Sequence, residues 1–305
     1  MQNKNAFIGI DVGGTYIKSG IVIDGLIKEK HIDKSPCNLD DFISFIHKIY
    51  QDYSKNLNII SIGLGIPGIF NHKENIMKYA TPSLSYLNEL PIKKELEKHL
   101  HIPVFITNDA NIVTIGEMKF GIGSKLDSAV CLTLGTGIGG GIFYRGKILI
   151  GDKGFAGEPG HINVKDNGRI CSCGIRKGCI ENYFSIYSIT NDVKNIKGKC
   201  YSIPDILHLA EDNDIDIINL LGNSAYLLGK AVASILLTLD IETIILAGGL
   251  SRFYDFIIQD IRKGISDYAY TTDYTEINIL KSSLFEDAGI LGAYSLAKTE
   301  GKILF

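Results

Sequence analysis

A duplicated pattern constrains the fold of this chain more than any other feature. When the 305-residue sequence is shifted by 121 positions, seven of the fourteen residues in 14–27 are identical to those in 135–148. Chance would give roughly one or two identities in stretches so rich in glycine and isoleucine. Both copies indicate a strand, a Gly-Thr turn, a second strand, a tight turn and a third strand. The repeat therefore predicts two similar halves, with a cleft between them as the natural place for a ligand.

Short apolar runs that end in turn residues indicate the central strands of an α/β sheet. Helical patterns lie between these runs, which argues for α/β layers. The predicted strands are 7–10, 59–66, 104–107, 129–134 and 241–246. The predicted helices are 39–50, 90–100, 214–239 and 287–298. Asn38 is the expected N-cap of the first helix, and Gly222 is an expected break in the third.

Composition and charge indicate a soluble globular protein. Hydrophobic residues make up 45% of the chain and charged residues 21%, and the formal net charge of −3 gives no electrostatic footprint for nucleic acid. Asp11 interrupts the first apolar stretch, and the long apolar stretch 232–250 contains Asp240 and Glu242. We therefore expect no signal peptide, no membrane span and a cytoplasmic protein.

Two glycine loops are the candidate phosphate-binding elements. They are Asp11-Val12-Gly13-Gly14-Thr15 and Gly135-Thr136-Gly137-Ile138-Gly139-Gly140-Gly141, and each follows an apolar strand. Glycine allows backbone N–H groups to point together at a phosphate. Thr15 and Thr136 each add a hydroxyl, and Asp11 is suited to hold Mg²⁺ directly or through water. Lys18 is either a further cation at the site or a solvated side chain.

Other interpretations of these glycines lack their structural context. Gly135, Gly137 and Gly140 match the dinucleotide-binding pattern, as do the glycines in 63–68, but no helix is predicted to begin after either set. The segment 141–148 nearly matches a P-loop, except that Ile148 stands where Ser or Thr must bind Mg²⁺. Plain hairpin turns remain an alternative for either loop alone and explain the repeated pair less well.

Asn108 and Asp109 stand at the end of the third strand, just before a helical pattern. Taken alone, Asp109 is most simply a helix N-cap. A carboxylate at that point equally fits a general base that faces a cleft.

One histidine and three cysteines lie within nineteen residues: His161, Cys171, Cys173 and Cys179. Zn²⁺ prefers four such ligands in a tetrahedron, and a site with no open position is structural. The alternative is three reduced thiols and a surface imidazole. The flanking Gly174 and Gly178 favour the zinc interpretation.

Taken together and in order, these motifs resemble the ROK family (repressor, ORF, kinase) of bacterial sugar kinases. The matching segments are 11–15, 108–111, 135–141, 158–161, 171–181, 248–249 and 287–289. The resemblance implies an α/β, actin-like (ribonuclease-H-like) duplicated two-lobe fold with a central cleft. We expect a smaller N-terminal lobe of 1–118 plus 290–305, and a larger C-terminal lobe of 119–289 that carries the zinc loop.

The resemblance also implies ATP-dependent phosphorylation of a hexose, usually at the 6-hydroxyl, with Mg²⁺ and a structural Zn²⁺. Asp109 would be the catalytic base. The implied substrate-binding residues are Gly68, Ser83, Asn108, Asp109, Glu158, His161 and Glu181. The implied ATP and Mg²⁺ residues are Asp11, Gly13, Gly14, Thr15, Lys18, Gly135, Thr136, Gly137, Gly139, Gly248 and Gly249. His161 would serve twice, with one ring nitrogen on zinc and the other on the sugar.

The chain departs from the family pattern at two places. Cys173 and Cys179 are six residues apart, where five is usual, and Thr81-Pro82-Ser83 replaces the common Ser-Pro-Asn. Glucose is the lead substrate, while allose, fructose, N-acetylmannosamine and N-acetylglucosamine stay open. The rivals of another class are a sugar-sensing repressor, for which the ten residues before Asp11 are too few to hold a DNA-reading helix pair, and a non-catalytic sugar sensor. Because dimers are common among relatives, we expect a homodimer.

Overall fold

The computed structural model describes residues 5–305, which divide into two compact units. The first unit comprises residues up to Asp127 together with Gly141–Ala156 and Ser283–Phe305, and the second comprises Ser128–Gly140 and Gly157–Ser282. The expected lobes differ from these units in segments 119–127, 141–156 and 283–289, which were expected in the second lobe and belong to the first unit. The lobe boundaries themselves stay a prediction.

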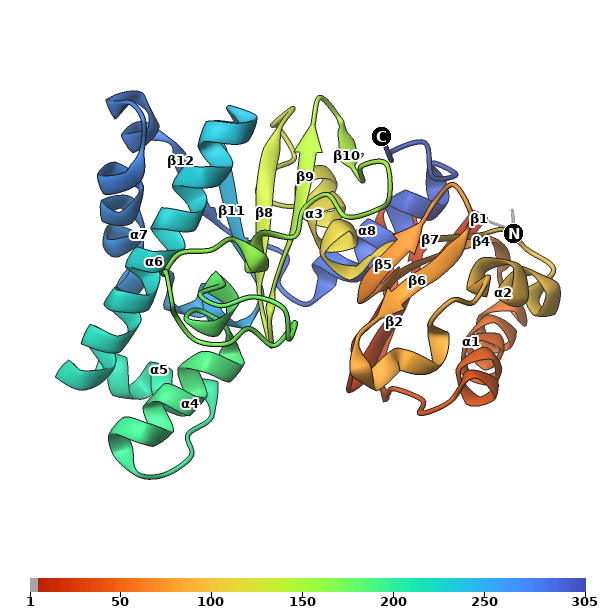
Figure 1. The fold of residues 1–305 in the computed structure, drawn as a ribbon. Coiled ribbons are helices and arrows are strands. Elements are labelled where there is room, and N and C mark those ends of the chain that lie inside the picture. The colour runs from red at the N-terminus through yellow and green to blue at the C-terminus, as the bar shows by residue number, and fades with distance from the viewer. Residues whose placement is uncertain (1–4) are drawn as a thin grey trace. The chain divides into compact units, whose positions relative to one another are not determined.

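The first unit holds a five-stranded sheet in the order β3-β2-β1-β4-β7, coloured from red through orange to yellow in Figure 1. β1 is antiparallel to β2 and parallel to β4, which is parallel to β7. Its elements are β1 (Asn5–Val12), β2 (Tyr16–Ile23), β3 (Leu26–Lys34), α1 (Leu39–Ser54), β4 (Asn58–Ile66), β5 (Gly68–Asn71), β6 (Ile76–Ala80), η1 (Pro82–Leu87), α2 (Ile92–Leu100), β7 (Val104–Asn108), α3 (Asp109–Phe120), β10 (Lys147–Leu149) and α8 (Asp287–Lys298).

Successive residues of β1 lie on opposite faces of this sheet, and each face packs against different elements. Ile8 and Ile10 point into the main apolar core with residues of α1 and α2. On the other face, Gly9 lies against the backbone of Ile290 in α8, and a β-carbon there would overlap with that carbonyl oxygen. Asp11 has the same parity as Gly9, so its carboxylate lies on the α8 face. The sheet is thus covered by helices on both sides.

The second unit is built around β8, β11 and β12 of a sheet with the order β10-β9-β8-β11-β12. The strand β9 (Ile138–Tyr144) belongs to the second unit up to Gly140 and to the first from Gly141. The remaining elements are β8 (Ala129–Leu134), η2 (Pro159–His161), η3 (Ile180–Asn182), α4 (Ile186–Lys197), α5 (Ile203–Glu211), α6 (Ile215–Leu239), β11 (Thr243–Ala247), η4 (Gly249–Phe253), α7 (Tyr254–Tyr268), η5 (Thr272–Glu276) and β12 (Asn278–Lys281).

The two strand orders confirm the duplication. β3, β2, β1, β4 and β7 correspond in position to β10, β9, β8, β11 and β12. The second corner of each copy is also the same. Asp24-Gly25 and Arg145-Gly146 both have positive φ at the two central residues, as a two-residue hairpin turn of type I′ requires.

The predicted break at Gly222 is wrong, because α6 runs without interruption from Ile215 to Leu239. The carboxylate of Asp260 on α7 packs where a side chain at residue 222 would stand, so the glycine serves helix packing. Among the described residues α6 is the one helix with the length and mean hydropathy of a membrane span, and 56% of its 18-residue apolar window is buried inside the protein. It also packs closely on α7 through Gly229 and Gly264, as a core helix does.

Candidate active site

The first glycine loop is closed by its own backbone and tied to a neighbouring strand. The N–H of Gly13 donates to the carbonyl oxygen of Tyr16 at 2.9 Å. Ser35, just after β3, donates its hydroxyl to the Gly13 carbonyl at 2.6 Å and its N–H to the Thr15 carbonyl at 2.9 Å. Sequence reasoning missed Ser35, because a serine after an edge strand carries no distinguishing signal. The loop is therefore held in place from both sides.

Asp11 stands at the start of this loop in an unusual environment. Burial raises the pKa of its carboxyl to about 6, and the charge of Lys18 opposes that rise. Lys18 is its direct partner across the β1–β2 pair. The backbone of Gly289 in α8 is so close that a β-carbon there would lie 2.5 Å from Asp11 Oδ2. The carboxylate is thus confined between a strand and a helix.

The N-cap of α3 is Asn108, so capping is the wrong interpretation of Asp109. Asn108 Oδ1 accepts from the N–H groups of Ala110 and Asn111, at 2.8 and 3.3 Å. Its Nδ2 donates to the carbonyl oxygen of Gly68 at 2.9 Å. Asp109 is the first helical residue and is half-buried. Asn108 therefore provides the cap, and Asp109 lies in the first turn of α3.

Gly68 and Ser83 both lie in the first unit. Gly68 has φ +124°, and a β-carbon there would overlap with the carbonyl oxygen of Tyr79, so only glycine suits this position. Ser83, in η1, lies against the first glycine loop, since a β-carbon at Gly14 would be 2.5 Å from its Oγ. The structure thus brings Ser83 beside Gly14, a neighbour that the sequence did not suggest.

The second glycine loop lies between β8 and β9, and the carboxylate of Glu181 packs against it. Glu181 Oε2 accepts from the N–H of Ile138 at 3.0 Å, and a β-carbon at Gly137 would overlap with that same oxygen. Glu181 Oε1 accepts from the hydroxyl of Ser172 at 2.5 Å. The glycine at 137 is therefore required by a side-chain contact. Ser172 was not predicted as a site residue, because only the two cysteines beside it were interpreted as functional.

Gly248 and Gly249 lie beside this second loop. Gly248 has φ +85°, and a β-carbon there would be 2.6 Å from the carbonyl oxygen of Leu134, the last residue of β8. Gly249 faces the side chain of Ile186, whose N–H donates to the Gly135 carbonyl at 2.8 Å. Within the second unit, two segments more than a hundred residues apart in sequence thus form one glycine-lined surface.

Glu158 stands just before η2, which ends at His161. Burial and, as a smaller effect, the nearby charge of Glu181 together raise the pKa of its carboxyl to about 7. Because the charge of Glu181 affects the pKa of Glu158, the two carboxylates lie near each other in the second unit.

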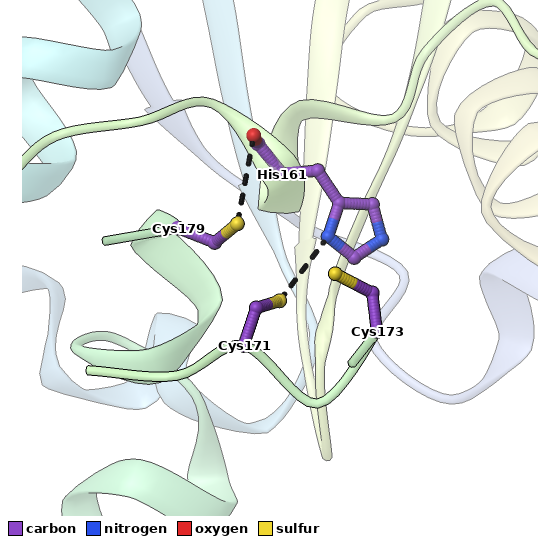
Figure 2. Close-up of side chains that lie close together, drawn as sticks. All are labelled: His161, Cys171, Cys173 and Cys179. Carbon is purple, nitrogen blue, oxygen red and sulfur yellow. Dashed lines mark hydrogen bonds between the residues drawn. The ribbon is translucent and has the colours of Figure 1, made fainter. Parts of the chain in front are cut away.

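His161, Cys171, Cys173 and Cys179 converge as the sequence suggested. Their ligand atoms all lie within 4.8 Å of one another. Figure 2 shows Nδ1 of His161 facing Cys171 Sγ, at 3.6 Å, while Cys179 Sγ donates to the His161 carbonyl at 3.7 Å. Around a tetrahedral Zn²⁺ the ligand atoms would be about 3.3–3.8 Å apart. The donor set thus fits zinc, while its separations of up to 4.8 Å exceed that spacing by about 1 Å.

The longer interval between Cys173 and Cys179 does not separate the sulfur atoms. The intervening loop turns at Gly174 and Gly178, with φ of +72° and +76°, and Ile175 between them is 87% exposed. The extra residue is thus accommodated outward. Burial raises the pKa of the Cys179 thiol to about 12, so a cation is needed to stabilise its thiolate at neutral pH.

The predicted site residues are divided between the units. The first unit holds Asp11, Gly13, Gly14, Thr15, Lys18, Gly68, Ser83, Asn108 and Asp109. The second unit holds Gly135, Thr136, Gly137, Gly139, Glu158, His161, Cys171, Cys173, Cys179, Glu181, Gly248 and Gly249. Each set is assembled locally within its own unit.

Comparison with known proteins gives the family. The family model described as ROK family matches residues 7–300. The chain belongs to the ROK family. This ROK protein is 32% identical to a glucokinase from Thermotoga maritima, over 97% of this chain and 98% of the relative. It is also 32% identical to the xylose repressor of Bacillus subtilis, over 96% of this chain and 78% of the repressor.

Solved structures confirm the actin-like fold of the family. The ROK hexokinase from Thermus thermophilus has a TM-score of 0.83 to this ROK protein at 25% identity, over 97% of this chain and 99% of that chain. A ROK glucokinase from Streptomyces griseus, solved in complex with glucose and AMPPNP, also has a TM-score of 0.83. It is 28% identical over 96% of this chain and 99% of that chain.

Proposed function

We propose that this ROK protein is an ATP-dependent hexose kinase that transfers the γ-phosphoryl group to a sugar hydroxyl, with the 6-hydroxyl of glucose as the lead acceptor. Support comes from the glucokinase relative, which matches over nearly the whole length of both chains. The observation that carries the proposal is the position of Asp109, a half-buried carboxylate at the first residue of α3, directly after the N-cap Asn108.

Asp109 is the catalytic base in this proposal. It accepts the proton of the sugar hydroxyl as that oxygen attacks the γ-phosphorus and ADP leaves. Backbone N–H groups of the two glycine loops stabilise the charge on the phosphoryl oxygens. Mg²⁺, when bound with ATP near Asp11, would neutralise further charge there. Thr15, Thr136, Lys18 and Gly139 are assigned to the phosphates, and Gly248 and Gly249 to the adenosine.

The sugar hydroxyls are assigned to polar groups with remaining hydrogen-bonding capacity. Asn108 has a second Nδ2 proton beyond the one given to Gly68. Glu158, His161 and Glu181 complete the polar set, and Gly68 and Ser83 contribute from the first unit. We assign a structural Zn²⁺ to His161 and the three cysteines. Coordination through Nδ1 would leave Nε2 of His161 for a sugar hydroxyl and hold the ring in one orientation.

Several further properties belong to the proposal. The two lobes of 1–118 plus 290–305 and 119–289 would close over the substrates and exclude water. We also propose a cytoplasmic homodimer that binds sugar and ATP and binds neither nucleic acid nor a membrane. Allose, fructose, N-acetylmannosamine and N-acetylglucosamine are the alternative acceptors.

A non-catalytic sugar sensor or regulator is the second candidate. The similarity to xylose repressors favours it, because it extends over 96% of this chain. The intact acids and both glycine loops argue for catalysis instead.

A sugar panel tests the proposal. ADP release is measured by a coupled assay with glucose, mannose, allose, fructose, N-acetylglucosamine and N-acetylmannosamine, and the position of the phosphate is read by NMR. We expect one hexose to give the highest kcat/KM, with the phosphate on its 6-oxygen. If sugars bind but none stimulates ADP release above the background without sugar, the sensor is correct and the kinase is not.

A further inference from the structure

Glu117 is a fully buried carboxylate that the proposed mechanism does not use. It lies on α3, eight residues after Asp109, and its side chain is inaccessible to solvent. Eight residues correspond to about two helical turns, or ~12 Å along the axis. A buried charge is costly unless hydrogen-bond donors surround it. The donors around Glu117 therefore indicate which segments its carboxylate stabilises.

Those partners are mainly backbone N–H groups from one short connection. Glu117 Oε1 accepts from the N–H of Leu284 at 3.0 Å. Oε2 accepts from the N–H of Ser283 at 3.3 Å and from the N–H of Ile122 at 3.2 Å. The Ser283 hydroxyl adds a longer bond of 3.4 Å. Glu117 thus fixes the backbone of residues 283–284 onto α3.

This connection is the point at which the chain returns to the first unit. Ser282 is the last residue of the second unit, and its N–H donates to the Leu246 carbonyl of β11 at 2.9 Å. Ser283 is the next residue and is bound by Glu117. Consecutive residues are therefore anchored in different units, and Glu117 provides the anchor in the first.

The helix that follows this anchor reaches the other acid of the site. The N–H of Asp287, the first residue of α8, donates to the carbonyl of Leu284 at 3.0 Å. Two residues later, Gly289 lies against the carboxylate of Asp11. The helices α8 and α3 also pack backbone to backbone, since β-carbons at Gly116 and Gly292 would overlap with carbonyl oxygens of the facing helix.

We propose that Glu117 is a positioning residue for phosphoryl transfer. It fixes the start of α8 on α3, and through Gly289 it sets where the Asp11 carboxylate stands relative to the helix that carries Asp109. This role rests on the proposed function. Glu117 touches no reacting atom, and its effect passes through α8.

The substitution Glu117→Gln tests this role with little change in volume. One acceptor oxygen becomes an NH₂ group, which faces N–H donors and releases at least one of them. We expect kcat to fall about tenfold when it is measured well below the melting temperature, with the sugar KM changed less than about twofold. Affinity for AMPPNP in the presence of Mg²⁺ falls similarly, and amide exchange at 283–290 accelerates.

Two controls separate positioning from general destabilisation. Leu96→Ala opens a cavity under α2 on the opposite face of the sheet, and it should lower stability without lowering kcat. The exposed Glu74→Gln makes the same chemical change at the surface and should alter nothing. If Glu117→Gln does not fold, Glu117→Asp, which keeps the charge but shortens the reach, is measured in its place.

Unchanged kcat and unchanged AMPPNP affinity, in a variant whose 283–290 amides exchange faster, would overturn the proposal. If the wild-type protein phosphorylates no sugar, the proposed function fails separately. Affinity for AMPPNP in the presence of Mg²⁺ then decides the role of Glu117: a fall in the variant supports it, and an unchanged or undetectable affinity rejects it.

Discussion

Asn108 donates from Nδ2 to the carbonyl oxygen of Gly68 at 2.9 Å, and thereby ties the cap of α3 to the start of β5. Asn108→Ala removes both this bond and the helix cap. We expect a loss of about 1 kcal/mol from the cap alone, together with a fall in kcat/KM, because Asp109 follows directly. Chemical denaturation and steady-state kinetics measure the two effects. Asn38 caps α1 in the same manner, so Asn38→Ala should lose stability while keeping its activity.

Asp109→Asn tests the proposed base. Removal of a general base typically lowers a rate about 10²–10⁴-fold, and the amide keeps the shape of the side chain. We therefore expect kcat to collapse while calorimetry still detects sugar binding. The exposed Asp166→Asn serves as the matched control. A variant at 109 with substantial remaining kcat would remove this residue from its role.

Gly137→Ala and Gly135→Ala form a matched pair within one loop. A β-carbon at 137 overlaps with Glu181 Oε2, whereas at 135 the nearest atom is 3.9 Å away. The first change should displace Glu181 and weaken sugar binding, measured without nucleotide, about tenfold. The second should leave nucleotide-free sugar binding unchanged. Equal sugar affinities in the two variants would show that Glu181 does not contact the sugar.

Cys173→Ser tests the metal and its coupling to the sugar. We expect zinc, measured by mass spectrometry, to be lost, and sugar affinity to fall roughly 10–100-fold as His161 loses its orientation. The exposed Cys200→Ser should retain both properties. Wild-type activity in a demonstrably zinc-free Cys173→Ser protein would reject the coupling.

His72 makes stability depend on pH. Burial, assisted by the charge of Lys93, lowers its pKa from 6.5 to about 4. In the unfolded chain His72 is therefore protonated below about pH 6.5, whereas in the folded protein it is protonated only below about pH 4. The contribution of His72 to stability is fully present above pH 6.5 and is lost as the pH falls toward 4, by about 3 kcal/mol. His72→Gln should flatten the denaturation profile between these pH values, while the exposed His99→Gln should not.

Much of the fold followed from periodicity and repetition, because buried strands and amphipathic helices leave strong local patterns. β3, with the sequence Leu-Ile-Lys-Glu-Lys-His-Ile-Asp-Lys, was expected only through the repeat, since an edge strand that is exposed on both faces has no apolar alternation. The prediction at Gly222 was wrong because, in sequence, a glycine that allows a neighbouring helix to pack closely cannot be distinguished from a glycine that ends a helix.

The site was predictable where chemistry requires rare residue types. The His and Cys cluster and both glycine loops belong to this class. The supporting contacts were not predictable, because they depend on which distant segments meet. Ser35, Ser172 and Glu117 are ordinary residues in sequence, and only the folded chain gives them partners. Asn108, and not Asp109, caps α3, because its neutral amide both accepts from the helix and donates to Gly68.

The packing of α8 has a consequence for biosynthesis. This helix covers the sheet of the first unit through Gly9 and Gly63, yet it comes after every residue of the second unit. During translation this face of the early strands is therefore covered only in part, by α3, while the ribosome makes more than half of the chain. The second unit ends at Ser282 and is complete first, so the part begun earliest is finished last.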